Sequence, residues 1–396
     1  MDPCCLLILI QLGFVTILAS SCPSELCSCS NAVISCSKRK LEKIPRFSWT
    51  PAPDQPYTEV DLRRNDIIAV PPFAFKGLPS TVTSIILDRN PLIGVSPRAF
   101  DGLEMTLTRL DMSNTDLEVV HWGVFRGLVS LKQLVLERNG MFAIPKGLFE
   151  GLKNLQDMSL AWNKLSVLRS GMFRGLEQLK TLSFQGNRIA SIEEGTFSLL
   201  RLLVVLNLNN NQLSFVDPLA VKGLDKLQVL DLENNLLPTV PMGIFLVLHS
   251  LDQVYLTKNN ISYVGSRSFQ GSIGLKEVHL SDNNIEYVSA DAFFGVPGLQ
   301  VIKLDDNSIE TLGESCILHY IDQVQELDLT ANPITCDCHM AWLSAMVAKG
   351  LRVKGQCESP THLKGSPLNL LNLTHCETHA CVSRVASRPS TKDSIP

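Results

Sequence analysis

The feature that most constrains this chain is a short pattern that recurs along its middle at a nearly constant interval. Segments such as VDLRRNDI, MSLAWNKL, LNLNNNQL and VHLSDNNI share the form L-x-L-x-x-N-x-L, with other apolar residues sometimes replacing Leu. One polar position recurs in steps of 24 or 25 residues: Asn65, Asn90, Thr115, Asn139, Asn163, Asn187, Asn211, Asn235, Asn259, Asn283, Asn307 and Asn332. Self-similarity at such a period is typical of solenoids, so twelve stacked turns are predicted.

Each turn adds an apolar side chain ten residues after the polar position. The L-x-L alternation predicts a short strand with one buried face, and such strands bury their leucines only when neighbouring turns stack. We therefore expect an α/β solenoid whose curved parallel β-sheet lines the concave face, with Val221 and Ile317 replacing the aromatic residue in two turns. The aromatic residues are Phe75, Phe100, Phe125, Phe149, Phe173, Phe197, Phe245, Phe269 and Phe293.

The column of Asn residues needs an explanation of its own. A polar side chain at a buried turn is costly unless its donors and acceptors are all matched. Stacking can supply the partners, because an Asn in one turn can bond the backbone of the turn beside it. We expect a continuous structural ladder, interrupted by Thr115, where the packing should change locally without a change of fold.

Cysteines cluster on both sides of the repeats. In an oxidising compartment such clusters predict disulfides, and here they would close the two ends of the solenoid, which otherwise expose apolar core and strand edges. The cluster before the repeats consists of Cys22, Cys27, Cys29 and Cys36. The cluster after them consists of Cys336, Cys338, Cys357 and Cys376.

Repeats and cysteine clusters together resemble the secreted extracellular leucine-rich repeat family with cysteine caps at both ends. Members with both caps include Slit-type guidance proteins, the Nogo receptor ectodomain and lamprey variable lymphocyte receptors. The resemblance covers residues 22–376 and specifies fold far better than partner. It implies that the first cysteine of each cap pairs with the third and the second with the fourth: Cys22 with Cys29, Cys27 with Cys36, Cys336 with Cys357, and Cys338 with Cys376.

The segment NPITCDCHMAWL could hold zinc, carry thiol redox chemistry, or staple the end of the solenoid. It starts at the last ladder residue, Asn332, and the apolar residues within 339–349 have helical spacing. Adjacent ligands at Cys336, Cys338 and His339 would crowd a tetrahedral zinc site, and a secreted chain would oxidise the thiols. We expect no metal site and no cofactor here, but an apolar helix held over the last turn by disulfides.

The N-terminal residues have the character of a cleaved signal peptide. The chain is almost wholly apolar from Cys4 to Ala19, with small residues at Ala19 and Ser21, and an uncleaved anchor is the alternative. No later segment reaches the roughly 18 consecutive apolar residues needed to span a bilayer. The predicted organisation is a signal peptide at 1–21, an N-terminal cysteine cap at 22–58, repeats at 59–332, a C-terminal cysteine cap at 333–376 and a disordered tail at 377–396.

Other features concern modification and assembly. The sequons Asn260-Ile-Ser and Asn372-Leu-Thr predict N-glycosylation. Cys316 lies beside an aromatic position of the repeat and is expected to be buried. Cys381, in the polar tail, could be free, pair with Cys316, or link two chains into a dimer.

The charge balance and the absence of known catalytic motifs limit the classes of function that the sequence supports. The 396 residues include 35 Lys and Arg against 39 Asp and Glu, without a basic block, so the electrostatic signature of nucleic-acid binding is missing. Hydrolase, metalloprotease, phosphate-loop and dinucleotide-binding motifs are also missing from the sequence, and we predict that the protein is not an enzyme.

Function is therefore expected on the concave face, at the strand positions that are not Leu. Two aromatic residues project there beside turns that become acidic toward the C-terminus, a combination that provides an anchor and favours a basic partner. The alternative is a solvated face that only keeps the protein soluble. The candidate ligand-binding residues are Trp162, Tyr255, Asp231, Glu233, Glu277, His279, Asp282, Asp305 and Asp306.

The predicted function is recognition or adhesion in the extracellular space or matrix, through an extracellular protein or glycan ligand on the concave face. One alternative is a structural matrix component similar to the small leucine-rich proteoglycans, although the CDC-type cap argues against that group. The other is a soluble decoy related to Toll-like receptors in innate immunity.

Overall fold

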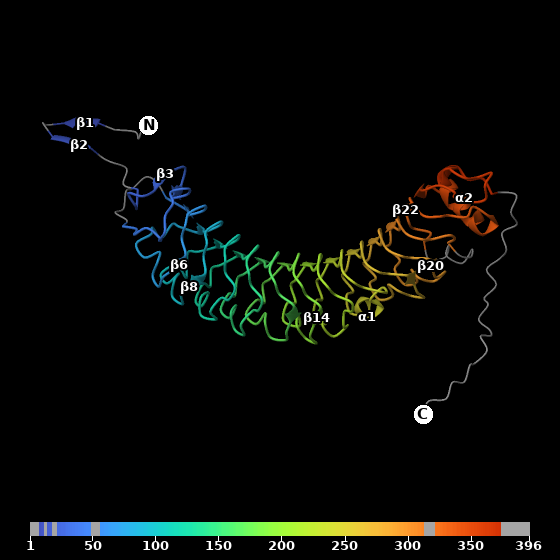
Figure 1. Cartoon of the computed structure of the whole chain (residues 1–396), viewed down its shortest axis with the longest axis horizontal. Coiled ribbons are helices and arrows are strands. Elements are labelled where there is room, and N and C mark those ends of the chain that lie inside the picture. The colour runs from blue at the N-terminus through green and yellow to red at the C-terminus, as the bar shows by residue number, and fades with distance from the viewer. Residues whose placement is uncertain (1–7, 12–13, 18–21, 49–55, 313–320, 374–396) are drawn as a thin grey trace, which may run out of the picture. The chain divides into compact units, whose positions relative to one another are not determined.

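The computed structural model describes residues 8–11, 14–17, 22–48, 56–312 and 321–373 (Figure 1). The chain divides into two compact units, which are described separately: an N-terminal unit up to Leu236 that includes Leu246–Leu251, and a C-terminal unit made of the remaining residues. Within the predicted signal peptide, β1 (Ile8–Gln11) and β2 (Phe14–Ile17) form a two-stranded antiparallel sheet. Several residues discussed above lie outside the described ranges, as does the predicted tail: Cys4, Ala19, Ser21, Cys316, Ile317, Cys376 and Cys381.

The N-terminal unit is a parallel sheet that grows from an antiparallel hairpin. In each repeat strand the central residue is buried, and the sheet register sets equivalent residues side by side, with Leu110, Leu134 and Met158 in one row. The hairpin is β3 (Ser28–Ser30) and β4 (Val33–Ser35). The repeat strands are β5 (Glu59–Asp61), β7 (Ser84–Ile86), β9 (Arg109–Asp111), β10 (Gln133–Val135), β11 (Asp157–Ser159), β13 (Thr181–Ser183), β15 (Val205–Asn207) and β16 (Val229–Asp231).

The C-terminal unit repeats this arrangement. Its strands are β17 (Gln253–Tyr255), β19 (Glu277–His279), β21 (Val301–Lys303), β22 (Glu326–Asp328) and, within the cap, β23 (Arg352–Lys354). Neighbouring strands from β17 to β23 are parallel. The twelve strands predicted for the repeats are thus all present, and the cap adds one strand that the sequence analysis did not predict.

Short elements lie away from the main strands in each unit. The paired two-residue strands are β6 (Ala69–Val70) with β8 (Gly94–Val95), β12 (Val167–Leu168) with β14 (Ser191–Ile192), and β18 (Tyr263–Val264) with β20 (Tyr287–Val288). The helices are α1 (Met242–Phe245), η2 (Cys338–Met340), α2 (Ala341–Ala348) and η3 (Leu368–Leu370). Apart from the main sheet, therefore, the turns use little regular structure.

The repeated phenylalanines form the core opposite the strands. All nine are at most 2% exposed, and the rings of several neighbouring turns stack, as Phe75 does on Phe100 with 5.5 Å between centroids. In the C-terminal unit Phe269 stacks on Phe293 at 5.6 Å. The N-terminal cap continues the row with Phe47, 6.5 Å from Phe75. This row confirms that turns are stabilised by their neighbours rather than singly.

The polar column is a hydrogen-bonded ladder, as predicted. The Nδ2 group of Asn187 donates to the carbonyl of Phe184 in its own turn at 2.8 Å and to that of Leu160 in the preceding turn at 3.0 Å. Its Oδ1 accepts from the backbone N–H of Leu165 at 3.1 Å. The pattern extends into the N-terminal cap, where Asn65 donates to the Cys36 carbonyl at 3.0 Å. Each Asn therefore satisfies buried backbone groups in two turns.

Thr115 changes this pattern locally. Its hydroxyl lies within hydrogen-bond distance of the Met112 carbonyl in its own turn and of the Asn139 Oδ1 in the following turn. The Leu92 N–H, which would face an Asn oxygen at this position, bonds the Asn90 carbonyl at 2.8 Å instead. The Thr side chain is shorter than that of Asn and carries one O–H donor instead of two N–H donors, so it cannot make all the bonds that Asn makes at the other positions.

Disulfides close both ends. The pairs Cys22–Cys29, Cys27–Cys36 and Cys336–Cys357 are present, the same pairs that the family resemblance implies. Cys338 is also disulfide-bonded, while its expected partner Cys376 lies outside the described residues. The CDC segment is therefore a staple in this structure, since its sulfurs form disulfides and not thiolate ligands.

The helix that follows the CDC segment is close to the predicted one. The Asp337 side chain accepts a hydrogen bond from the His339 N–H at 2.9 Å, which fixes a tight first turn, and α2 itself begins at Ala341. Trp342 is buried, and its indole N–H donates to the Leu312 carbonyl at 3.4 Å. The helix thus covers the apolar end of the repeats.

The ladder predicts a specific stability cost. Replacing Asn187 with Ala removes the partners of three buried backbone groups, and we expect a loss of roughly 2–4 kcal/mol in the free energy of unfolding. The control is Asn154→Ala, because exposed Asn154 makes one surface bond to the Val129 carbonyl. Urea unfolding followed by circular dichroism measures both. Equal losses for the two variants would contradict the ladder's role.

Candidate functional site

In every repeat one residue of the exposed sheet surface has an unusual backbone. We call this surface of either unit, formed by the side chains that point away from the core along the main strands, the strand face. The residue just before each ladder position has φ between +50° and +68°, which few residues other than Gly adopt. This conformation turns the chain so that the next side chain enters the ladder.

These residues form what we call the left-handed column. In the N-terminal unit the column starts in the cap, and its backbone N–H groups bond the next turn, as Arg64 does to the Asp88 carbonyl at 2.9 Å. Its members there are Lys38, Arg64, Arg89, Asn114, Arg138, Trp162, Gly186, Asn210 and Asn234. The members in the C-terminal unit are Lys258, Asp282, Asp306 and Ala331.

The chemistry of the column changes along the N-terminal unit: up to Arg138 its members are cations except for Asn114, and Trp162 is followed by Gly186 and two amides. A left-handed conformation costs roughly 1–2 kcal/mol for most residues and less for Asn and Asp, which bond their own backbone. Cations and a Trp at these positions therefore carry a conformational cost that Gly or Asn would avoid. The sequence contains the signal, since each member within the repeats directly precedes a ladder residue, whereas Lys38 of the cap precedes Arg39 and has no such signal.

Trp162 is the most unusual member of the column. Its side chain is 42% exposed, yet residues of both neighbouring turns hold it. The guanidinium carbon of Arg138, in the preceding turn, lies 5.2 Å from the ring centroid, and Gly186, in the following turn, lies against the ring. A Cβ at Gly186 would be 2.5 Å from the ring. The indole is therefore a positioned aromatic surface rather than a loose exposed side chain.

A hydrogen-bonded amide network follows Trp162 on the same unit. Asn209 donates to Asp231 at 2.7 Å, and Asn234 donates to Asn210 at 2.6 Å. Burial raises the pKa of the Asp231 carboxyl above its usual value. The hydrogen bonds from the Glu233 N–H and from Asn209 oppose this rise, and the Glu233 charge adds to it. The two predicted acids of this unit therefore lie close together at the end of β16, where Asp231 is the last strand residue and Glu233 follows two residues later.

In the C-terminal unit the structure brings three predicted site residues together. The rings of Tyr255 and His279 stack at 4.4 Å with 21° between their planes. The His279 Nε2 lies 3.1 Å from Glu277, and Gln253 joins Tyr255 to Glu277 by accepting from the phenol and donating to the carboxylate. The cluster is half-buried, so its faces are presented in a fixed arrangement.

The remaining predicted acids lie on the following turns. Asp282 and Asp306 are exposed and are consecutive members of the left-handed column. Asp305 lies beside them and accepts a hydrogen bond from Ser281 at 2.7 Å. These three carboxylates form an acidic patch on the strand face of the C-terminal unit.

The acidic patch ends at a mixed cluster that the sequence analysis missed. Strand β23 of the cap places Arg352 and Lys354 beside Glu326, and Lys303 of β21 contacts the same carboxylate. Hydrogen bonds from Lys303 and Lys354 lower the pKa of Glu326 to about 2. Asp328 also bonds Lys354, at 3.3 Å. The cap therefore neutralises acids that the sequence pattern alone assigns to an acidic face.

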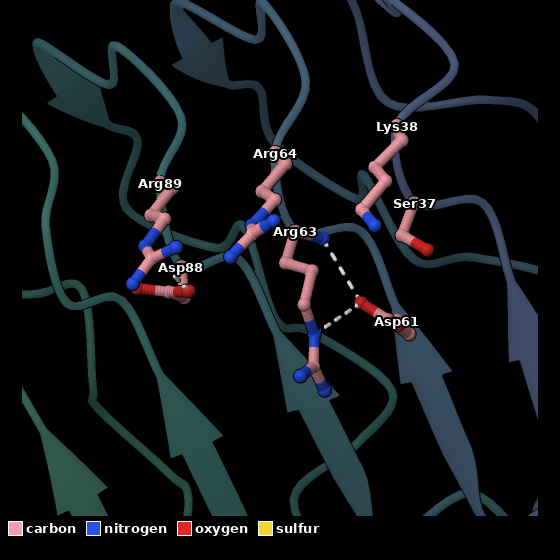
Figure 2. Close-up of a pocket in the computed structure, with 7 residues that line it drawn as sticks. All are labelled: Ser37, Lys38, Asp61, Arg63, Arg64, Asp88 and Arg89. Carbon is pink, nitrogen blue, oxygen red and sulfur yellow. Dashed lines mark hydrogen bonds and ion pairs between the residues drawn. The ribbon is translucent and has the colours of Figure 1, made fainter.

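A polar hollow of about 410 Å³ lies at the start of the left-handed column (Figure 2). Its lining residues come from the cap and the first two repeats: Ser37, Lys38, Asp61, Arg63, Arg64, Asp88 and Arg89. In Figure 2 the side chains of Lys38, Arg64 and Arg89 stand in a row, with Arg63 below them. None of these seven residues is among the candidate binding residues predicted from the sequence.

Within the described ranges, no three His, Cys, Asp or Glu side chains lie close enough together to hold a metal ion. None of the helices in that part of the chain has the length and apolar character needed to cross a membrane.

Comparison with known proteins assigns the family. The leucine rich repeat family profile matches residues 80–141, 130–189, 177–237 and 273–334, more than half of the chain. The chain belongs to the leucine-rich repeat family. Among curated proteins, zebrafish (Danio rerio) leucine-rich repeat-containing protein 3 is 32% identical over 133 residues, which are 32% of this chain and 37% of that protein. The chain thus matches well under half of that relative's length.

Solved structures agree on the fold of this leucine-rich repeat protein. A chain of the octameric complex of Latrophilin 3, Unc5D and FLRT2 superposes with a TM-score of 0.64 at 20% identity, over 89% of this chain and 100% of that one. A chain of the TLR13–ssRNA13 complex gives a TM-score of 0.61 at 22% identity, over 81% of this chain and 54% of that one. Identities this low support the shared fold alone.

The contact between Gly186 and Trp162 gives a test with a matched control. Gly186→Ala adds a Cβ into the Trp162 ring, whereas Gly171→Ala meets nothing within 4 Å, and both glycines have positive φ. We expect Gly171→Ala to cost about 1–2 kcal/mol from backbone strain alone, and Gly186→Ala to cost more and to shift the Trp162 fluorescence. Urea unfolding and difference fluorescence against Trp162→Phe measure these effects. Identical behaviour of the two variants would exclude the contact.

The Glu326 cluster predicts a pH dependence in this leucine-rich repeat protein. Because folding lowers the Glu326 pKa from 4.5 to about 2, the ionised group stabilises the folded state above pH 4.5, and this contribution is lost as the pH falls toward 2. Glu326→Gln should lose about 1 kcal/mol at pH 7, after discounting for solvent screening, and almost nothing near pH 2. The control is Glu286→Gln, because Glu286 is exposed, and its effect should be small at both pH values. Urea unfolding midpoints of both variants at pH 7 and near pH 2 measure the difference.

Proposed function

We propose that this protein is secreted and recognises an extracellular protein through the strand face of its repeats, without catalytic activity of its own. Leucine-rich repeat solenoids present a long row of strands, and adjacent strands about 4.8 Å apart give a surface wide enough for a protein partner. The side chains on this surface differ from turn to turn while the backbone repeats. A recognition role fits that combination of a constant scaffold and variable surface.

The observation that carries the proposal is the position of Trp162. A bulky aromatic in a left-handed conformation is an outlier, and such outliers cluster at functional sites. Arg138 and Gly186 hold the indole while 42% of it stays exposed. Interface anchors are most often Trp, Tyr and Arg, and a side chain that is ordered before binding loses little entropy when a partner arrives.

The C-terminal unit supports a partner with basic character at its strand face. The Tyr255–His279 stack is fixed by Glu277 and Gln253, and exposed Asp282 and Asp306 lie on the same unit. Complementary charge speeds association and selects among partners more than it adds affinity. We therefore propose Tyr255 as an anchor and the acidic patch as the steering element.

Secretion and glycosylation belong to the same proposal. Disulfides at both ends fit an oxidising compartment, because thiols stay reduced in the cytosol. Asn260 and Asn372 of the two sequons are exposed, as a glycan requires. FLRT2, whose structure was solved with Latrophilin 3 and Unc5D, has the same fold and takes part in an assembly of several proteins. These observations support an extracellular adhesion or recognition role.

The test is a binding screen of the purified, glycosylated protein against extracellular proteins, repeated with strand-face variants. With the partner found, Trp162→Ala should weaken binding by at least about tenfold, because truncating a central anchor typically costs about 2 kcal/mol. Tyr255→Ala should act in the same direction. Raising the salt concentration should slow association with a basic partner.

The matched control is Phe142→Ala. Phe142 is 54% exposed but lies three residues beyond the ladder residue Asn139, outside the strand face. It should bind like the unmodified protein. Normal binding by both Trp162→Ala and Tyr255→Ala would refute the strand-face proposal. Recovery of the protein mainly in matrix-bound, disulfide-linked form, with no protein ligand, would favour a structural role instead.

A further inference from the structure

The polar hollow of Figure 2 contains more positive than negative charge. Lys38, Arg64 and Arg89 are consecutive members of the left-handed column, so their Cα positions follow the spacing of adjacent strands, about 4.8 Å. Arg63 adds a fourth cation, whereas Asp61 and Asp88 are the two carboxylates in the lining. Three cations in a row on a repeating backbone suit a ligand that is itself a repeating anion.

The two carboxylates are already engaged. Asp61 accepts from the Arg63 Nε at 2.8 Å and from the Arg63 backbone N–H at 3.1 Å. Asp88 accepts from the Asn114 side chain at 2.8 Å and lies 3.7 Å from the Arg89 Nε. Among the described residues, none forms an ion pair with Lys38 or Arg64.

The left-handed backbone of Lys38, Arg64 and Arg89 has a conformational cost that solubility alone does not explain. Lys38, Arg64 and Arg89 have φ of +57°, +56° and +55° and are exposed. Asn at these positions would lower the backbone cost and remain soluble, as it does at Asn114 and Asn210 in the same column. Three adjacent cations also repel one another, so the arrangement is stabilised when an anion binds.

The lining identifies the chemical class of the ligand. All seven residues are polar or charged, so the hollow offers no apolar pocket for a side chain of a folded protein or a hydrophobic peptide. Guanidinium groups bind sulfate and phosphate oxygens through paired hydrogen bonds, and Ser37, Asp61 and Asp88 can bond hydroxyl groups. A ligand with regularly spaced sulfates, many hydroxyls and little apolar surface is a sulfated glycan chain.

The cap extends the positive surface beyond the hollow. Residues 38–46, KRKLEKIPR, contain five cations and one carboxylate, and Arg39 and Lys40 are exposed next to Lys38. A chain-like anion seated in the hollow has further cations available along this segment. The overall charge of −4 hides this local excess, so the expectation that the chain has no basic block was wrong for residues 38–46.

We propose that Lys38, Arg63, Arg64 and Arg89 form a binding site for a sulfated glycan chain on the N-terminal unit. The site is distinct from the Trp162 surface and does not depend on the proposed protein ligand. Binding there would hold the secreted protein at glycan-rich cell surfaces or matrix while the rest of the strand face stays available.

The experiment uses the full secreted chain and a heparin decasaccharide, with affinity measured by titration calorimetry at several salt concentrations. The variant Arg64→Asn/Arg89→Asn keeps residues that tolerate the left-handed backbone and removes two charges. We expect at least a tenfold loss of affinity and a fall of about two in the slope of log affinity against log salt. Arg64→Lys/Arg89→Lys should retain most of the affinity, which shows that the fold at this site survives substitution.

The matched control is Arg174→Asn/Arg201→Asn, which removes the same charge from exposed positions outside the hollow and should change affinity less than twofold. Equal losses of affinity in both double variants would mean that only the net charge of the protein matters, and would contradict a specific site at the hollow. Unchanged binding by Arg64→Asn/Arg89→Asn would do the same. Equal competition by desulfated heparin, polyglutamate or single-stranded RNA would overturn the ligand class. Partner binding through Trp162 is measured separately, so failure of one proposal leaves the other testable.

Discussion

The Asn ladder is the interaction on which the rest of this structure depends. Each Asn satisfies backbone groups of two turns, so it fixes both the conformation of a turn and its distance from the next. The phenylalanine row then fills the interior at the same spacing. Because the ladder reaches the Cys36 carbonyl, the N-terminal cap is held by the same bonds as the repeats. Stability and register therefore have one origin.

The ladder also shapes the surface that we propose as the binding surface. To point each Asn inward, the residue before it takes a left-handed conformation, and its side chain is placed on the strand face. The backbone there is constant from turn to turn, so the side chain can vary, but residues other than Gly, Asn and Asp carry a conformational cost of roughly 1–2 kcal/mol. Cations at Arg64 and Arg89, an indole at Trp162 and carboxylates at Asp282 and Asp306 are products of that freedom.

Periodicity made the fold predictable, and contacts between turns limited what could be predicted of the site. The strands, the ladder, the phenylalanine row and the helix after the CDC segment all repeat or follow a local signal in the sequence. The packing of Trp162 between Arg138 and Gly186 needs the register of three turns. Strand β23 has no repeat signature, so its neutralisation of Glu326 could not be foreseen. Cys376 and Cys381 lie outside the described residues, and their pairing stays a prediction.

The two capped ends differ in how completely their charges are paired. At the C-terminal cap, Lys303, Arg352 and Lys354 all contact Glu326, and the low pKa of that carboxyl reflects the pairing. At the N-terminal cap, Lys38 and Arg64 face a hollow whose carboxylates already bond other groups. Paired charges stabilise the fold by themselves, whereas unpaired cations in a row raise its energy until an anion arrives. That difference supports placing the proposed anion site on the N-terminal unit, whereas the paired charges at the C-terminal cap stabilise the fold.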